Sequence, residues 1–172
     1  MESRNIDLKS FKIKAGKNKK VYTTFLKGLH NRPETKKIDK LARELDKEAF
    51  EKIDCLSCGN CCKTMTPTFL TVDIKRIAKH LKITAKEFEV KYLEKDKKEW
   101  VNTKQPCQFL GSDNKCSIYE IRPKDCRGFP HTHVANPGFV GASKTNREFF
   151  WRCPIVYHVV DNVYKRVLEK NV

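Results

Sequence analysis

Half of the eight cysteines of this 172-residue chain lie within eight consecutive positions. The segment reads CLSCGNCC, so Cys55, Cys58 and Cys61 follow a CxxCxxC spacing and Cys62 comes directly after them. A gap of two residues lets successive thiolates converge on one metal from a tight turn, and Gly59 supplies the backbone freedom that such a turn needs. The alternative is four buried structural thiols, which would have to sit among polar neighbours with no hydrophobic run. The spacing therefore predicts metal chelation.

The adjacent pair Cys61 and Cys62 cannot easily present both thiols in the same direction. Successive side chains diverge by about 100° in a helix and face opposite ways in a strand. We therefore expect one of the two thiols to face away from the centre that CxxCxxC forms. That thiol would serve a second metal, bridge two metals, or remain a free thiol near the site.

The other four cysteines, Cys107, Cys116, Cys126 and Cys153, are widely spaced. They contain no second CxxC pair, which excludes a zinc ribbon or treble clef, and no HxxxH element supports a two-histidine finger. Cys153 precedes a proline, as does the remote cysteine of bacterial ferredoxins, so an iron-sulfur cluster competes with zinc. Four thiolates also suit tetrahedral zinc. The spacing leaves both metals open.

Positive charge is concentrated near the N-terminus. The chain has 36 Lys and Arg against 21 Asp and Glu, a formal charge of +15, and residues 1–32 hold nine basic and two acidic side chains, a net charge of +7. We predict a basic N-terminal arm at 1–32 and a single metal-binding domain at 33–172. A solvated, partly mobile leader is the favoured interpretation of the arm, and contact with nucleic acid or an acidic protein is the alternative. Five apolar residues are expected to dock part of the arm: Val21, Tyr22, Phe25, Leu26 and Leu29.

The expected cellular compartment rests on two features that are not found in the sequence, a secretory signal and a membrane helix. The chain begins without the apolar stretch of a secretory signal, and no apolar run approaches the roughly 18 to 20 residues of a membrane helix. We therefore expect a cytoplasmic protein without a membrane partner. Reducing compartments keep thiols available for metals, and eight cysteines in 172 residues fall below the roughly 8 to 10% of a disulfide scaffold.

The hydrophobic pattern predicts helices separated by one short hairpin. Apolar residues at three- and four-residue steps predict a helix over 33–54, and Thr71 is the expected N-cap of a second helix. Thr84 opens a capping box and therefore a third helix. The turn sequence at 111–115, between two cysteine-containing arms, predicts a β-hairpin, and a final helix is expected from Pro154. The predicted fold is mainly α with a short β-hairpin, a small irregular α+β domain organised around Cys-ligated metal.

The chain contains no G-x-G-x-x-G, P-loop, G-x-S-x-G or H-E-x-x-H motif, so catalytic residues stay unassigned. Arg122 and Arg127 flank Cys126. They are candidates to hydrogen-bond thiolates or an anionic substrate. Ion pairs with Glu120 and Asp125 are the alternative.

The order of the cysteine motifs along the chain resembles that of a known family. CLSCGNCC, PCQFL, CSIYEIRPKDCRGFPH and WRCP follow one another, and this succession resembles the CxxCxxCC cysteine-cluster family, also called the YkgJ-like zinc- or iron-chelating domain. The resemblance covers roughly residues 50–155. It implies bound zinc or an iron-sulfur cluster such as 4Fe-4S, and it implies that all eight cysteines are metal ligands: Cys55, Cys58, Cys61, Cys62, Cys107, Cys116, Cys126 and Cys153.

Three functional hypotheses follow. The first is a cytoplasmic metalloprotein whose cysteine cluster holds an iron-sulfur cluster or zinc, with the chemistry of an oxidoreductase or a transferase left open. The second is a zinc-stabilised module that binds nucleic acid or an acidic protein partner through its basic arm. The third is a metal that only stabilises a small core.

Overall fold

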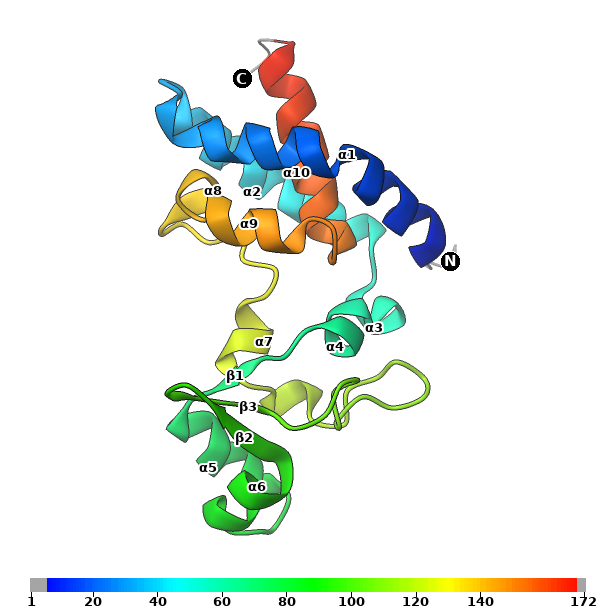
Figure 1. The fold of residues 1–172 in the computed structure, drawn as a ribbon, viewed down its shortest axis with the longest axis vertical. Helices are drawn as coiled ribbons and strands as arrows, with labels where there is room; N and C mark the ends of the chain where they lie inside the picture. Colours follow the sequence, from blue (N-terminus) through cyan, green and yellow to red (C-terminus); the bar gives the residue numbers. More distant parts are fainter. Residues whose placement is uncertain (1–5, 170–172) are drawn as a thin grey trace. The chain divides into compact units, whose positions relative to one another are not determined.

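The computed structural model describes residues 6–169, which form many helices and one small antiparallel sheet (Figure 1). This composition confirms the predicted mainly α fold with a short β-hairpin, and its organisation around Cys-ligated metal stays a prediction. The chain divides into two compact units. The first unit joins the chain up to Cys58 with the chain from Pro130 onward, and the second unit is the segment between them, Gly59–Phe129. The boundary therefore falls inside the cysteine motif.

The first unit is helical and is organised around the C-terminal helix α10. Its α10 follows the predicted pattern from Pro154, with Val156, Val159, Val160 and Val163 all fully buried. Helix α10 packs against α1 and α2, and Figure 1 shows it in orange and red beside them. The elements of this unit are α1 (Leu8–Gly28), η1 (Leu29–Asn31), α2 (Thr35–Lys52), α3 (Cys55–Cys58), α8 (Gly138–Gly141), α9 (Ser143–Phe149) and α10 (Pro154–Leu168).

Helix α1 contains most of the basic segment. Asp7 caps it by accepting the N–H groups of Lys9 and Ser10. Of the five residues expected to dock this segment, four are buried and Val21 is 44% exposed, so that single assignment is wrong. The Tyr22 hydroxyl donates to Asp161 on α10. The division into an arm at 1–32 and a domain at 33–172 stays a prediction, but α1 is packed on the first unit rather than free of it.

The second unit places a three-stranded sheet beside two helices. The strand order is β1-β3-β2, with antiparallel pairing throughout. Its apolar core gathers around Phe88 and includes Phe69, Ile74, Ile77 and Phe109. The elements are α4 (Asn60–Thr64), β1 (Thr68–Phe69), α5 (Thr71–His80), α6 (Ala85–Tyr92), β2 (Leu93–Asp96), β3 (Glu99–Asn102), η2 (Tyr119–Ile121) and α7 (Lys124–Gly128).

The hairpin lies at a different place from the predicted one. Strands β2 and β3 form it, with Lys97 in the left-handed region at the turn. The predicted hairpin around 111–115 reduces to a single bridge between Leu110 and Cys116. The Leu110 N–H donates to the Cys107 carbonyl 3.0 Å away. The Gly111 N–H donates to the Lys115 carbonyl and the Ser117 N–H donates to the Phe109 carbonyl, each at 2.8 Å, so the two arms pair around this bridge.

One of the two predicted helix starts is confirmed and the other is wrong. Thr84 caps α6 through the Glu87 N–H, and Glu87 reaches back to the Thr84 N–H, which confirms the capping box. Thr71 is not an N-cap but the first residue of α5. The capping residue is Leu70, whose N–H donates to the Asp73 carboxylate. The Asp73 side chain satisfies the helix start in place of Thr71.

None of the helices within residues 6–169 combines the length and the apolar character that a membrane crossing requires.

The core of the second unit gives a first prediction. Phe88→Ala should lower the free energy of unfolding by about 3 to 5 kcal/mol, because it removes a fully buried ring and leaves a cavity. Val90→Ala on the same helix is the control, since Val90 is 75% exposed and should change stability by less than about 0.5 kcal/mol. Urea unfolding followed by circular dichroism measures both. Equal effects of the two substitutions would contradict this core.

Candidate metal centre

The cysteine motif folds as two short helices joined at a left-handed glycine. Asp54 caps α3, because its carboxylate accepts the N–H groups of Leu56 at 3.0 Å and Ser57 at 3.2 Å. Gly59 follows with φ +55, and a Cβ there would lie 3.2 Å from the Cβ of Asn114. Both its conformation and its surroundings therefore favour glycine. The predicted turn at Gly59 is confirmed.

Three cysteines belong to the first unit: Cys55, Cys58 and Cys153. Cys55 is exposed, whereas the other two are buried. Burial raises the pKa of Cys153 to about 12. The thiolate charges of Cys55 and Cys58 raise this pKa further. Hydrogen bonds from the backbone N–H groups of Val156 and Ile155, at the start of α10, lower it.

Five cysteines belong to the second unit, and two of them are the adjacent pair on α4. The Sγ atoms of Cys61 and Cys62 lie 3.9 Å apart. The Cys61 thiol and burial raise the pKa of Cys62 well above its ordinary range. The side chains of two successive helical residues thus approach each other, although their directions from the helix axis differ by about 100°.

Cys107, Cys116 and Cys126 complete the second unit's thiols. The Cys107 N–H donates to the Cys62 carbonyl at 2.8 Å, and the bridge to Leu110 holds Cys116 close to the chain after Cys107. Burial is the main cause that raises the pKa of each of the three thiols. The Cys62 thiolate raises the pKa of all three further.

A buried carboxylate holds the helix that carries Cys126. Asp73 is fully buried and accepts from the Lys124 N–H at 3.2 Å and from the Arg76 guanidinium at 2.6 Å. Asp125 accepts from the Thr68 N–H of β1 at 3.0 Å. These bonds join α7 to β1 and α5, so Cys126 is positioned by the core of its own unit.

Arg122 acts within its own loop. Its guanidinium donates to the Tyr119 carbonyl at 2.6 Å and lies 3.8 Å from the centre of the Tyr119 ring. Its positive charge nevertheless reaches Cys116, where it opposes the burial that raises the thiol's pKa. The hydrogen bond of Arg122 goes to a backbone carbonyl, so its predicted hydrogen bond to a thiolate stays a prediction.

Chelation by all eight cysteines stays a prediction. All eight lie within residues 6–169 and are thiols, not disulfides. Over this part of the chain, no three side chains among His, Cys, Asp and Glu are already arranged to hold an ion. The donor chemistry fits zinc or iron, but a metal has to draw the thiols together as it binds.

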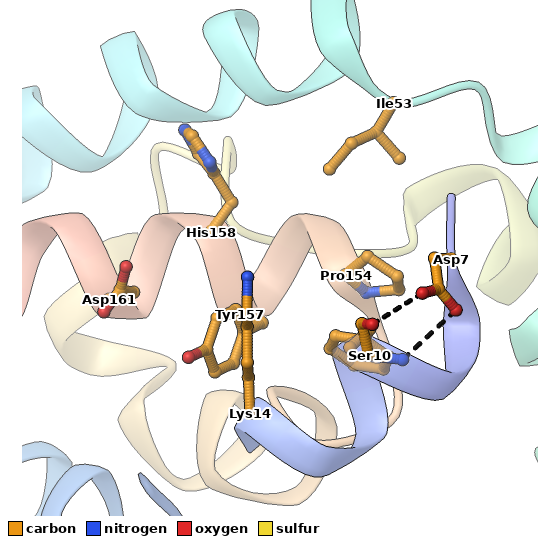
Figure 2. A pocket seen from close by; sticks show the side chains of 9 residues that line it. Asp7, Ser10, Lys14, Ile53, Pro154, Tyr157, His158 and Asp161 are labelled. Atoms are coloured by element: carbon orange, nitrogen blue, oxygen red, sulfur yellow. Dashed lines mark hydrogen bonds between the residues drawn. The ribbon is translucent and has the colours of Figure 1, made fainter. Parts of the chain in front are cut away.

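A cavity of about 330 Å³ lies in the first unit beside the cysteine-bearing segments (Figure 2). Ile53, just before the motif, and Pro154, just after Cys153, both line it. The cavity therefore places the chain around Cys153 near the start of the motif. Asp7 also lines it, but Figure 2 shows its carboxylate bonded to Ser10. That carboxylate is occupied by the start of α1.

His158 lines the same cavity on α10. Its Nε2 lies 3.7 Å from a carboxylate oxygen of Glu48. Burial lowers the His158 pKa from its ordinary 6.5, and the Glu48 charge opposes this. The folded protein therefore favours the neutral imidazole. The sequence offers no signal for this residue, because the Glu48 contact forms only when α2 and α10 pack.

The model of the CxxCxxCC family, described as a putative zinc- or iron-chelating domain, matches residues 54–154, more than half of the chain. No solved structure matches the chain.

His158 gives a prediction for pH. As pH falls below the ordinary histidine value, the unfolded chain takes up a proton before the folded one does, so stability falls until the lowered pKa is passed. His158→Gln should remove this part of the decrease. Urea unfolding from neutral to mildly acidic pH measures it, with exposed His80→Gln as the control. An unchanged pH dependence in the His158 variant would contradict the prediction.

Proposed function

Because the chain belongs to the CxxCxxCC family, we propose that it is a cytoplasmic metal-binding protein whose cysteines hold zinc or an iron-sulfur cluster such as 4Fe-4S. The observation that carries the proposal is that all eight cysteines are free thiols within the matched residues 54–154 and that seven of them are buried or half-buried. The proposed ligands are drawn from Cys55, Cys58, Cys61, Cys62, Cys107, Cys116, Cys126 and Cys153.

The chemistry of buried thiols supports this proposal. A thiolate taken out of water without a cation is unfavourable, which is why burial raises the pKa of Cys126 and Cys153. A bound cation reverses this cost, because coordination deprotonates a thiol. Sites rich in thiolates select zinc and iron-sulfur clusters over hard cations such as magnesium. A buried thiol cluster is therefore suited to a soft metal and to a reducing compartment.

The bound group would supply the chemistry. An iron-sulfur cluster would exchange electrons, and zinc would stabilise the fold or polarise a ligand. Redox or group-transfer activity is part of the proposal only if the bound group is an iron-sulfur cluster. The part that belongs to the chain is to bury the thiols and to fix the helices beside them, α7 within the second unit through the Asp73 bonds and α10 within the first unit through the valine core.

The test is metal and sulfide analysis of anaerobically purified protein, with its visible spectrum. A brown protein with acid-labile sulfide would establish an iron-sulfur cluster, and colourless protein with zinc and no sulfide would establish zinc. Protein that carries neither metal, and that takes up neither zinc nor iron with sulfide under reducing conditions, would contradict the proposed function.

A second candidate function rests on the charge of α1. This helix contains seven lysines and no acidic residue. Its buried residues lie on one side, and lysines such as Lys12, Lys17 and Lys20 are exposed. Such a surface can attract nucleic acid or an acidic protein. We propose it as the contact of a metal-stabilised binding module.

Substitution is a better test of this candidate than deletion of residues 1–32, because α1 contributes Tyr22, Leu26 and other buried side chains to the first unit. The triple variant Lys12→Gln, Lys17→Gln, Lys20→Gln should weaken duplex DNA binding. It should also make the slope of log K against log salt shallower by about 0.9 for each DNA phosphate that the variant no longer neutralises.

The matched control replaces three exposed lysines of the second unit by Gln: Lys75, Lys79 and Lys82. It removes the same charge, so equal weakening by both variants would show non-specific attraction. Absence of DNA binding, together with binding of a polyglutamate peptide that the α1 substitutions abolish, would identify an acidic protein partner instead.

A further inference from the structure

We infer that Asn102 is a positioning residue for Cys107: its buried side-chain amide, oriented by Gln108, donates an N–H to the sulfur of Cys107 when that sulfur is a thiolate bound to metal. This inference rests on the proposed function and deepens it, because it names a residue outside the cysteines that stabilises one of the proposed ligands. All three residues belong to the second unit.

The amide of Asn102 is buried with only one of its two polar atoms paired. Asn102 is the last residue of β3 and is 4% exposed. Its Oδ1 accepts from Gln108 Nε2 at 3.2 Å. Its Nδ2 is also buried, but no group among residues 6–169 accepts a hydrogen bond from it. Buried donors are nearly always paired in folded proteins, so this N–H₂ group needs a functional explanation.

The hydrogen bonds of Gln108 fix which way the Asn102 amide faces. Gln108 Nε2 donates to the Tyr92 carbonyl at 3.1 Å as well as to Asn102 Oδ1. A carbonyl only accepts, so Gln108 has to turn its nitrogen, and not its oxygen, toward Tyr92. That nitrogen only donates, so Asn102 has to turn its oxygen toward Gln108. The network therefore fixes the oxygen and nitrogen positions of both amides, and it places Asn102 Nδ2 on the side that Gln108 does not use.

Cys107 lies next to this amide. It directly precedes Gln108, which is bonded to Asn102. Burial raises the pKa of Cys107, whereas hydrogen bonds from the Phe109 N–H and from the Asn102 side chain lower it. The Asn102 side chain thus stabilises the sulfur in its charged form.

The sulfur of Cys107 is a different acceptor in the free and in the metal-bound protein. A thiol sulfur accepts hydrogen bonds only weakly, which agrees with the unpaired Nδ2 of Asn102 beside the free Cys107. A ligand thiolate carries a charge, and hydrogen bonds to charged acceptors are about twice as strong as neutral ones. Because a metal binds cysteine as the thiolate, the event that makes Cys107 a ligand also gives Asn102 its acceptor. Hydrogen bonds to a ligand from outside the ligand set orient it and stabilise the bound metal.

The test loads the reduced, ¹⁵N-labelled full-length protein with ¹¹³Cd²⁺, which binds thiolates as zinc does, and records its NMR spectra. Scalar coupling passes through a hydrogen bond to a ligand sulfur, so one side-chain N–H of Asn102 should be coupled to ¹¹³Cd. The Cβ protons of Cys107 should be coupled to the same nucleus. The buried Asn146 amide is the matched control, because it donates to the Phe139 carbonyl at 3.0 Å and should show no coupling. This measurement needs no substitution.

Two variants provide the second measurement. Asn102→Leu removes the N–H₂ group and keeps the branched shape of the side chain, and it should weaken Zn²⁺ binding about 10- to 100-fold. Gln105→Leu removes an exposed amide from the chain just before Cys107, and it should leave the affinity unchanged. In Co²⁺-loaded protein, Asn102→Leu should also move the sulfur-to-cobalt charge-transfer band to longer wavelength, because a thiolate without this hydrogen bond gives up electron density more readily. A loss of packing alone would not shift that band.

The outcomes separate this inference from the proposed function. Protein that binds none of Zn²⁺, ¹¹³Cd²⁺ and iron with sulfide contradicts the proposed function itself. Coupling of ¹¹³Cd to Cys107 but not to the Asn102 amide overturns the hydrogen bond, as does a folded Asn102→Leu variant that keeps both the affinity and the charge-transfer band. Bound ¹¹³Cd²⁺ without coupling to Cys107 overturns the role of Asn102 as well, because Cys107 would then not be a ligand.

Discussion

The cost of burying a thiolate is the constraint on which the rest of this structure depends. In each unit the core takes thiols out of water, and burial raises the pKa of Cys107, Cys116, Cys126 and Cys153. Nearby thiolates raise these values further, because like charges in a low dielectric repel. A cluster of this kind carries its negative charge only when a cation balances it. The arrangement of the cysteines therefore makes sense around a metal and is unfavourable as an array of free thiolates.

The elements that carry the thiols are held by contacts that use no cysteine. In the second unit, buried Asp73 accepts from the backbone of α7 and from Arg76, and Asp125 bonds to β1. In the first unit, the valine face of α10 packs against α2. Each unit thus fixes the elements that carry its thiols by ordinary core packing. No three Cys, His, Asp or Glu side chains among residues 6–169 are placed to hold an ion, so a metal that binds would have to draw its ligands together.

The basic helix shows how charge and packing combine in one element. Its lysines give it a strong positive charge, whereas Phe11, Ala15, Tyr22 and Leu26 bury the opposite side. The Tyr22 hydroxyl donates to Asp161, so the helix is tied to α10 by a polar bond as well as by apolar packing. An element that looks like a solvated leader by composition is therefore part of the first unit. Its lysines lie on a packed helix. A partner would therefore not have to order this segment on binding, as it would a mobile tail.

The sequence by itself determined the local features. The glycine turn at Gly59, the capping box at Thr84 and the 3.6-residue periodicity of α2 and α10 depend on neighbours within a few positions, and each appears as predicted. Only the tertiary structure decided the placement of the hairpin and which unit each cysteine belongs to. Strand pairing and helix packing join residues far apart in the chain, such as Glu48 and His158, and spacing contains no information on which distant segments meet. The CxxCxxC motif looks continuous in sequence, but the fold divides it after Cys58, because the core of each unit, and not the spacing, decides where each thiol is buried.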